Sequence, residues 1–170
     1  ESDGDWRIEG DPMEGALLTL ARKGGVDADA EVTTWPRVDL IPFDSQHRFM
    51  ATLHHDHTGE AVVLLKGAPE RVLEMCHRQA HPEGDAPLDL DHWQAEVERL
   101  AGDGQRVLAL ARKPAPSTPV ELDFADVEAG LVLLGLVGLI DPPRDEAIRA
   151  VADCRRSEER RVGKECATGC

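Results

Sequence analysis

The stretch Ala61-Val62-Val63-Leu64-Leu65-Lys66-Gly67-Ala68-Pro69-Glu70 joins an apolar run directly to a cation, a glycine and a proline. The run 61–65 is typical of a strand, and Pro69 suits the first turn of a helix, where no backbone amide donor is needed. Gly67 allows the backbone to turn without a Cβ atom. The stretch therefore predicts a strand-to-helix corner at Lys66, whose ammonium group suits an anionic ligand. A solvated corner lysine would show the same local pattern.

The composition limits the classes of partner that this chain can have. Its 170 residues carry a net charge of −14, and 41% of them are hydrophobic, which is sufficient for one domain with its own core. The negative charge argues against a nucleic-acid or anionic-membrane partner, because it opposes association with phosphate polymers. No apolar run approaches the ~20 residues that cross a bilayer. The four cysteines show neither zinc spacing nor a disulfide framework, which favours a reducing compartment.

Several strands are expected around the central corner. Residues 48–55 and 60–66 are predicted to form an antiparallel hairpin around Asp56-His57-Thr58-Gly59. A period-two pattern from Glu31 to Ile41 predicts another strand, which ends at the turn Pro42-Phe43-Asp44-Ser45. Further along the chain, residues 105–112 and 130–140 are also strand-like.

Helices and loops are expected between these strands. Asp11 and Pro12 are typical of a helix start, and this helix carries Glu14 in its first turn and ends at Gly24-Gly25. Residues 78–87 are polar, contain two prolines and a glycine, and are predicted to form a loop. Together the elements predict an α+β fold: a mainly antiparallel, twisted sheet flanked by helices.

The histidines at positions 54, 55 and 57 do not predict a metal site. Adjacent positions on a strand point to opposite faces, and no carboxylate or thiol completes a ligand set. No metal ligand is therefore expected among them.

Five separated motifs carry the functional signal, and they occur in a characteristic order. They are Gly10-Asp11-Pro12-Met13-Glu14, Pro42-Phe43-Asp44-Ser45 with Arg48-Phe49-Met50, Lys66 to Glu70, Gly104-Gln105-Arg106-Val107-Leu108-Ala109, and Asp141 to Arg144. Together they resemble the nucleotide-binding domain of P-type cation-transporting ATPases, in particular the calcium-pump-like branch in bacteria. The resemblance covers residues 10–154.

The resemblance implies an ATP site without a P-loop, since no Gly-x-x-x-x-Gly-Lys motif occurs. Phe43 would stack on the adenine ring, and Glu14 would accept a hydrogen bond from the adenine amino group. Arg48 and Arg106 would serve the phosphates. The full set of expected binding residues is Glu14, Phe43, Arg48, Lys66, Gly67, Arg106, Asp141 and Arg144.

The resemblance also implies a domain organisation. Residues 1–9 would be a lead-in, 10–140 the nucleotide-binding domain, and 141–156 a hinge with the first helix of a phosphorylation domain. The tail 157–170 departs from the family pattern. It is interpreted as appended, artefactual sequence, with a divergent natural tail as the alternative.

The parent protein implied by the family is an enzyme that couples ATP hydrolysis, with Mg²⁺ on the nucleotide, to cation transport. Its phosphorylated aspartate lies in an Asp-Lys-Thr-Gly-Thr motif that is absent from these residues, so no catalytic residue is predicted here. The chain would be a cytoplasmic part of a bacterial plasma-membrane protein, with phosphorylation, actuator and membrane domains as partners and no membrane contact of its own. Calcium is favoured as the cation; magnesium, sodium and protons are the alternatives.

Two other functions are compatible with the residues. One is a stand-alone nucleotide-binding module, and the other is an acidic interaction domain in which the corner at Lys66 is only structural. ATP binding distinguishes the second of these from the nucleotide site.

Overall fold

The computed structural model describes residues 12–116, 121–140 and 145–165. Its helices are α1 (Pro12–Lys23), α2 (Ala28–Thr34), α3 (Pro69–Met75), α4 (Leu90–Gly102), α5 (Phe124–Val127) and α6 (Asp145–Glu165), and its strands are β1 (Arg37–Ile41), β2 (Phe49–His55), β3 (Ala61–Gly67), β4 (Cys76–Gln79), β5 (Ala86–Pro87), β6 (Arg106–Ala115) and β7 (Leu131–Leu139). The chain divides into two compact units, residues 1–139 and 140–170, and α6 belongs to the second.

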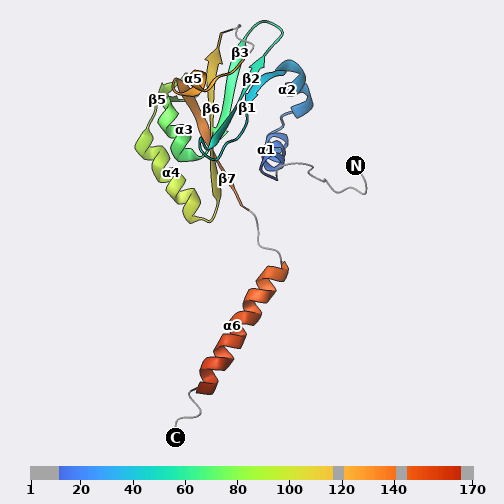
Figure 1. Cartoon of the computed structure of the whole chain (residues 1–170), viewed down its shortest axis with the longest axis vertical. Helices are drawn as coiled ribbons and strands as arrows, with labels where there is room; N and C mark the ends of the chain where they lie inside the picture. The colour runs from blue at the N-terminus through green and yellow to red at the C-terminus, as the bar shows by residue number, and fades with distance from the viewer. Residues whose placement is uncertain (1–11, 117–120, 141–144, 166–170) are drawn as a thin grey trace. The chain divides into compact units, whose positions relative to one another are not determined.

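The strands of the first unit form one sheet in the order β1-β2-β3-β6-β7-β4-β5 (Figure 1). Neighbouring strands run antiparallel, except that β4 and β7 are parallel. The predicted α+β class with a mainly antiparallel sheet is therefore confirmed. The predicted hairpin is present as well, because β2 pairs with β3 along its whole length, from Phe49 opposite Gly67 to His55 opposite Ala61.

Asp56 stabilises the turn of this hairpin. Its Oδ2 accepts a hydrogen bond from the Thr58 hydroxyl (2.7 Å), and its Oδ1 accepts from the backbone N–H groups of Thr58 (2.9 Å) and Glu60 (2.7 Å). These hydrogen bonds, that from the Thr58 hydroxyl foremost, hold the pKa of the Asp56 carboxyl below its ordinary value. Gly59 completes the turn at a φ of 91°, a left-handed conformation that favours glycine.

The two faces of the sheet differ in character. Side chains alternate between the faces of a strand, and in β2 the residues Phe49, Ala51 and Leu53 enter the hydrophobic core. Helices α3 and α4 pack against β6 and β7. Figure 1 shows α3 and α4 on one side of the sheet and α1 and α2 on the other. The alternate residues of β2 therefore face the side of α1 and α2, two helices that have no buried residues.

The strand predicted from Glu31 onwards is wrong for residues 31–34, which belong to α2. Asp27 caps this helix, because its Oδ1 accepts hydrogen bonds from the backbone N–H groups of Asp29 (3.1 Å) and Ala30 (3.2 Å). The strand itself begins only at Arg37. The cap expected at Asp11 lies outside the described residues.

The predicted loop at 78–87 contains strand residues. The residues of β4 pair in parallel with β7, and the two residues of β5 pair with β4 at the edge of the sheet. Both strands are too short to produce a period-two signal. Within the described ranges, no helix combines the length and the apolar content that crossing a bilayer requires.

Candidate functional site

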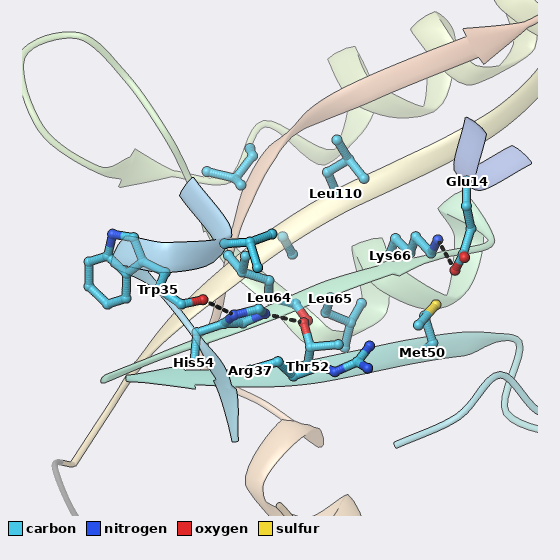
Figure 2. Close-up of a pocket in the computed structure, with 13 residues that line it drawn as sticks. Glu14, Trp35, Arg37, Met50, Thr52, His54, Leu64, Leu65, Lys66 and Leu110 are labelled. Atoms are coloured by element: carbon cyan, nitrogen blue, oxygen red, sulfur yellow. Dashed lines mark hydrogen bonds and ion pairs between the residues drawn. The ribbon is translucent and has the colours of Figure 1, made fainter. Parts of the chain in front are cut away.

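A cavity of about 590 Å³ lies on the side of the sheet that carries α1 and α2. Sites for small organic ligands typically measure roughly 300–1,000 Å³. The lining residues come from two helices, five strands and the link between α2 and β1 (Figure 2): Glu14, Val32, Trp35, Arg37, Met50, Thr52, His54, Leu64, Leu65, Lys66, Leu110, Ala111 and Leu134. Most of them are apolar.

Lys66 and Glu14 form an ion pair at one end of the cavity (Figure 2). The Lys66 Nζ lies 3.1 Å from the Glu14 Oε1, and the side chains are 22% and 57% exposed, respectively. A largely buried ammonium group requires a partner, and Glu14 supplies it. The two residues are 52 positions apart in the chain, and the structure brings them together at the corner where β3 leads into α3.

Trp35, Arg37 and His54 line the other end of the cavity. The His54 Nδ1 lies 2.9 Å from the backbone oxygen of Trp35, and its Nε2 lies 2.9 Å from the Thr52 hydroxyl. With the proton on Nδ1, the ring donates to Trp35 and accepts from Thr52. Sequence reasoning missed these residues. For His54 a signal was present: its period-two spacing with Met50 and Thr52 indicates that these three strand residues share one face.

Phe43 lies in the loop between β1 and β2, is 64% exposed, and is not among the residues that line the cavity. Asp44 orders this loop: its Oδ1 accepts hydrogen bonds from the N–H groups of Gln46 (2.6 Å) and His47 (3.3 Å), and its backbone oxygen accepts from Arg48 (2.7 Å). The hydrogen bonds from Gln46 and then His47 hold the pKa of the Asp44 carboxyl below its ordinary value. The loop therefore presents the Phe43 ring to solvent on an ordered backbone.

Arg48 adopts a left-handed conformation with a φ of 59°, the one positive φ of a non-glycine residue among those described. Its backbone oxygen accepts a hydrogen bond from the N–H of Ala68 at 2.9 Å. Its Nη1 lies 2.6 Å from the Glu70 Oε1. Arg48 does not line the cavity, but these contacts attach it to the corner that holds Lys66.

Gly67 is required by a close approach of two backbone segments. A Cβ atom on Gly67 would lie only 2.6 Å from the backbone oxygen of Arg48 and 2.7 Å from the Cβ of Phe49. The sequence explained this glycine by the freedom of a turn, whereas the structure shows that it allows β2 to pass close to β3.

Arg106 is the first residue of β6 and is exposed, and the described residues offer it no ion pair. On the same strand, Leu110 lies opposite Lys66. Arg106 and Leu110 share a face because they are four positions apart, an even number, and four residues of strand span about 13 Å. Arg106 thus lies on the Lys66 side of β6, beyond the end of the cavity. Asp141 and Arg144 lie outside the described residues.

Those expected site residues that the structure describes are thus gathered at one end of the sheet but not in one cavity. The strand register places the end of β1, the start of β2, the end of β3 and the start of β6 side by side. Glu14 and Lys66 line the cavity, while Phe43, Arg48 and Arg106 stand outside it along this edge.

The described residues contain little that could serve covalent or metal chemistry. Cys76 is buried, and burial raises the pKa of its thiol to about 12, so that it is not a nucleophile near neutral pH. Among the described side chains, no three from the histidine, cysteine, aspartate and glutamate classes converge as they would around a metal ion.

Comparison with known proteins identifies a family with this domain. A family described as P-type ATPase, cytoplasmic domain N, matches residues 1–146. The chain is 42% identical to the cation-transporting ATPase pma1 of Synechocystis sp. over 88% of its own length and 16% of that protein. It is 35% identical to a calcium-transporting ATPase of Bacillus subtilis (91% of the chain, 18% of the relative) and 35% identical to the sodium/potassium exporting P-type ATPase cta3 of Schizosaccharomyces pombe (91% and 15%). The chain spans about a sixth of the length of these curated relatives.

Proposed function

The chain belongs to the family of P-type ATPase cytoplasmic N domains, and from this premise we propose that its cavity receives the adenine end of ATP. One observation carries the proposal: a carboxylate and an ammonium group stand 3.1 Å apart at one end of a cavity whose lining is mostly apolar. A purine ring needs apolar walls for its faces and polar groups for its edge, and the cavity offers both.

The ion pair has the polarity that the Watson–Crick edge of adenine requires. Adenine presents an amino donor at N6 next to an acceptor at N1. The carboxylate of Glu14 is acceptor-only, and the ammonium group of Lys66 is donor-only. Glu14 would therefore accept from N6 while Lys66 donates to N1.

The exposed residues along the same sheet end would complete the site. Phe43 would stack on the adenine ring, a contact worth about 1–3 kcal/mol for a base on an aromatic side chain. Arg48 and Arg106 would bind the phosphates through charge-assisted hydrogen bonds. Gly67 supports this corner, and Asp141 and Arg144 remain proposed at the hinge.

For the whole protein we propose the coupling of ATP hydrolysis to cation transport across a membrane. Mg²⁺ would arrive with the nucleotide, and phosphorylation, actuator and membrane domains outside these residues would act on it. The chain itself would be cytoplasmic and would only bind and present ATP. A calcium-transporting relative supports calcium as the cation, although another relative exports sodium and potassium.

Titration of the 170-residue chain with ATP tests the proposal. We expect binding with a Kd of about a millimolar, near −4 kcal/mol. Phe43→Ala is expected to weaken binding at least about fivefold, because it removes the stacking ring. Lys66→Met is expected to weaken it several-fold, because it removes the donor to the base. Calorimetry or ligand-observed NMR measures both effects.

Lys23→Met is the matched control, because Lys23 is an exposed lysine of α1 that does not line the cavity. It should leave the Kd unchanged. No ATP binding, or binding that is indifferent to both site variants, would remove the support for a nucleotide site and favour the acidic interaction domain.

The base specificity follows from the polarity of the ion pair. Guanine presents an acceptor at O6 next to a donor at N1. The acceptor Glu14 would then face another acceptor, and the donor Lys66 would face another donor. We expect ATP to bind about tenfold more tightly than GTP, since a hydrogen bond contributes about 0.5–1.5 kcal/mol. Competition titrations with the two nucleotides measure this ratio.

The exchanged variant Glu14→Lys with Lys66→Glu keeps an ion pair but reverses its polarity. It should narrow or invert the preference for ATP. An unchanged ratio in this variant would show that the ion pair does not contact the base edge.

A further inference from the structure

The main chain and the side chain of Arg48 are held by two different groups of the same corner. The N–H of Ala68 binds its backbone oxygen at 2.9 Å, and the carboxylate of Glu70 binds its guanidinium group at 2.6 Å. Its backbone also occupies a left-handed conformation that non-glycine residues rarely adopt. Arg48 is therefore placed by specific contacts rather than by the preference of its own backbone.

Glu70 is the counter-ion of Arg48 in this structure. The two side chains are 49% and 57% exposed, so water competes for both. An ion pair with this exposure contributes little to folding stability, because solvent screens it and two long side chains lose freedom. The ion pair matters more for ligand binding. The Glu70 carboxylate occupies one N–H donor of the guanidinium group and neutralises the charge of Arg48.

We infer that Glu70 is a positioning residue that acts through Arg48, and that the phosphates of a nucleotide exchange with it. This inference rests on the proposed function, since it requires phosphates at Arg48. In the absence of ligand, Glu70 keeps the guanidinium group next to the β3–α3 corner. On binding, a phosphate oxygen takes over Nη1, and the carboxylate returns to water. Part of the phosphate binding energy is thereby used to break the ion pair.

The inference has a clear consequence for ligand selectivity. Breaking the Arg48–Glu70 ion pair lowers the affinity only of ligands that carry phosphates, because adenosine has no phosphate that could bind Arg48. Removing the charge of Glu70 should therefore strengthen ATP binding and leave adenosine binding unchanged. A residue with a merely structural role would affect both ligands alike.

Titrations of the 170-residue chain with ATP and with adenosine test this. Glu70→Gln is expected to increase the affinity for ATP about three- to fivefold, as breaking an exposed ion pair would allow, and to leave adenosine binding within the error. In an Arg48→Met background, Glu70→Gln should have no effect on ATP, because the residue through which it acts is missing.

Glu74→Gln is the matched control. Glu74 lies on the same helix, is also paired with an arginine (Arg71 at 3.3 Å), and is exposed. The substitution Glu74→Gln removes the same charge one helical turn further on, and it should change the affinity for ATP by less than Glu70→Gln does.

The outcomes separate the inference from the proposed function. Equal gains from Glu70→Gln and Glu74→Gln, or a gain that persists without Arg48, would show general charge repulsion and overturn the inference. Binding of ATP that does not respond to Glu70→Gln would overturn it as well, while the proposed function stands. Failure of both ATP and adenosine to bind the unaltered chain would overturn the proposed function and the inference with it.

Discussion

Replacing Phe49 by alanine is expected to lower the free energy of unfolding by about 3–5 kcal/mol. The ring is 2% exposed and is among the largest fully buried side chains of the described residues. It meets the ring of Phe124 edge to face at 6.1 Å between centroids, and that of His47 at 6.2 Å. Alanine would lose these contacts and leave a cavity, because the Phe49 ring belongs to the close-packed hydrophobic core. Urea denaturation measures the loss.

Phe43→Ala is the matched control for this prediction. The Phe43 ring is 64% exposed, so its removal should change the free energy of unfolding by less than about 0.5 kcal/mol. A loss as large as that of Phe49→Ala would mean that Phe43 packs into a core. The Phe43 ring would then be unavailable for the proposed stacking on adenine.

Gly67→Ala is expected to lower the free energy of unfolding by about 3 kcal/mol, at the upper end of what overpacking costs. The added Cβ would meet the Arg48 backbone oxygen at 2.6 Å and the Phe49 Cβ at 2.7 Å. Both obstacles belong to or adjoin the backbone, so they cannot turn away as the tip of a flexible side chain could. The strands β2 and β3 would have to separate locally. Thermal and urea denaturation measure the effect.

Gly102→Ala is the control for the glycine, because nothing lies within 4 Å of a Cβ atom at this helical position. Alanine is the better helix former, so this variant should be neutral or more stable by up to about 1 kcal/mol. If Gly67→Ala were as harmless as Gly102→Ala, the close approach of Arg48 to β3 would be wrong. The two destabilising variants should not be additive when combined, because Phe49 and Gly67 are in contact.

Several elements could be predicted because their causes are local. The hairpin was visible from two strand-like segments around a turn with Asp56 and Gly59, and α3 begins at Pro69 as expected. The strand at residues 31–34 was wrong because the pattern of apolar residues was given more weight than the capping side chain of Asp27. The short strands β4 and β5 could not be predicted, because they exist only through their pairing with β7 and with each other.

In the candidate site, too, some features could be predicted from the sequence and others depend on tertiary contacts. The sequence indicated Lys66 and Glu14 as members of one site, through motif resemblance and not through spacing. It did not indicate that they bind each other, nor that Arg48 binds Glu70. Trp35, Arg37 and His54 were missed because they carry no motif, and only the alternation of β2 and the position of α2 bring them to the cavity.

By itself, the sequence determined the fold class, most of the helices and strands, and the family, because capping, alternation and ordered motifs are recorded within short stretches of chain. Only the tertiary structure decided which charged groups neutralise each other and which side chains share a cavity. Those partners are 22 residues apart for Arg48 and Glu70 and 52 for Glu14 and Lys66. Their meeting depends on the order and register of the strands between them, which local spacing does not encode.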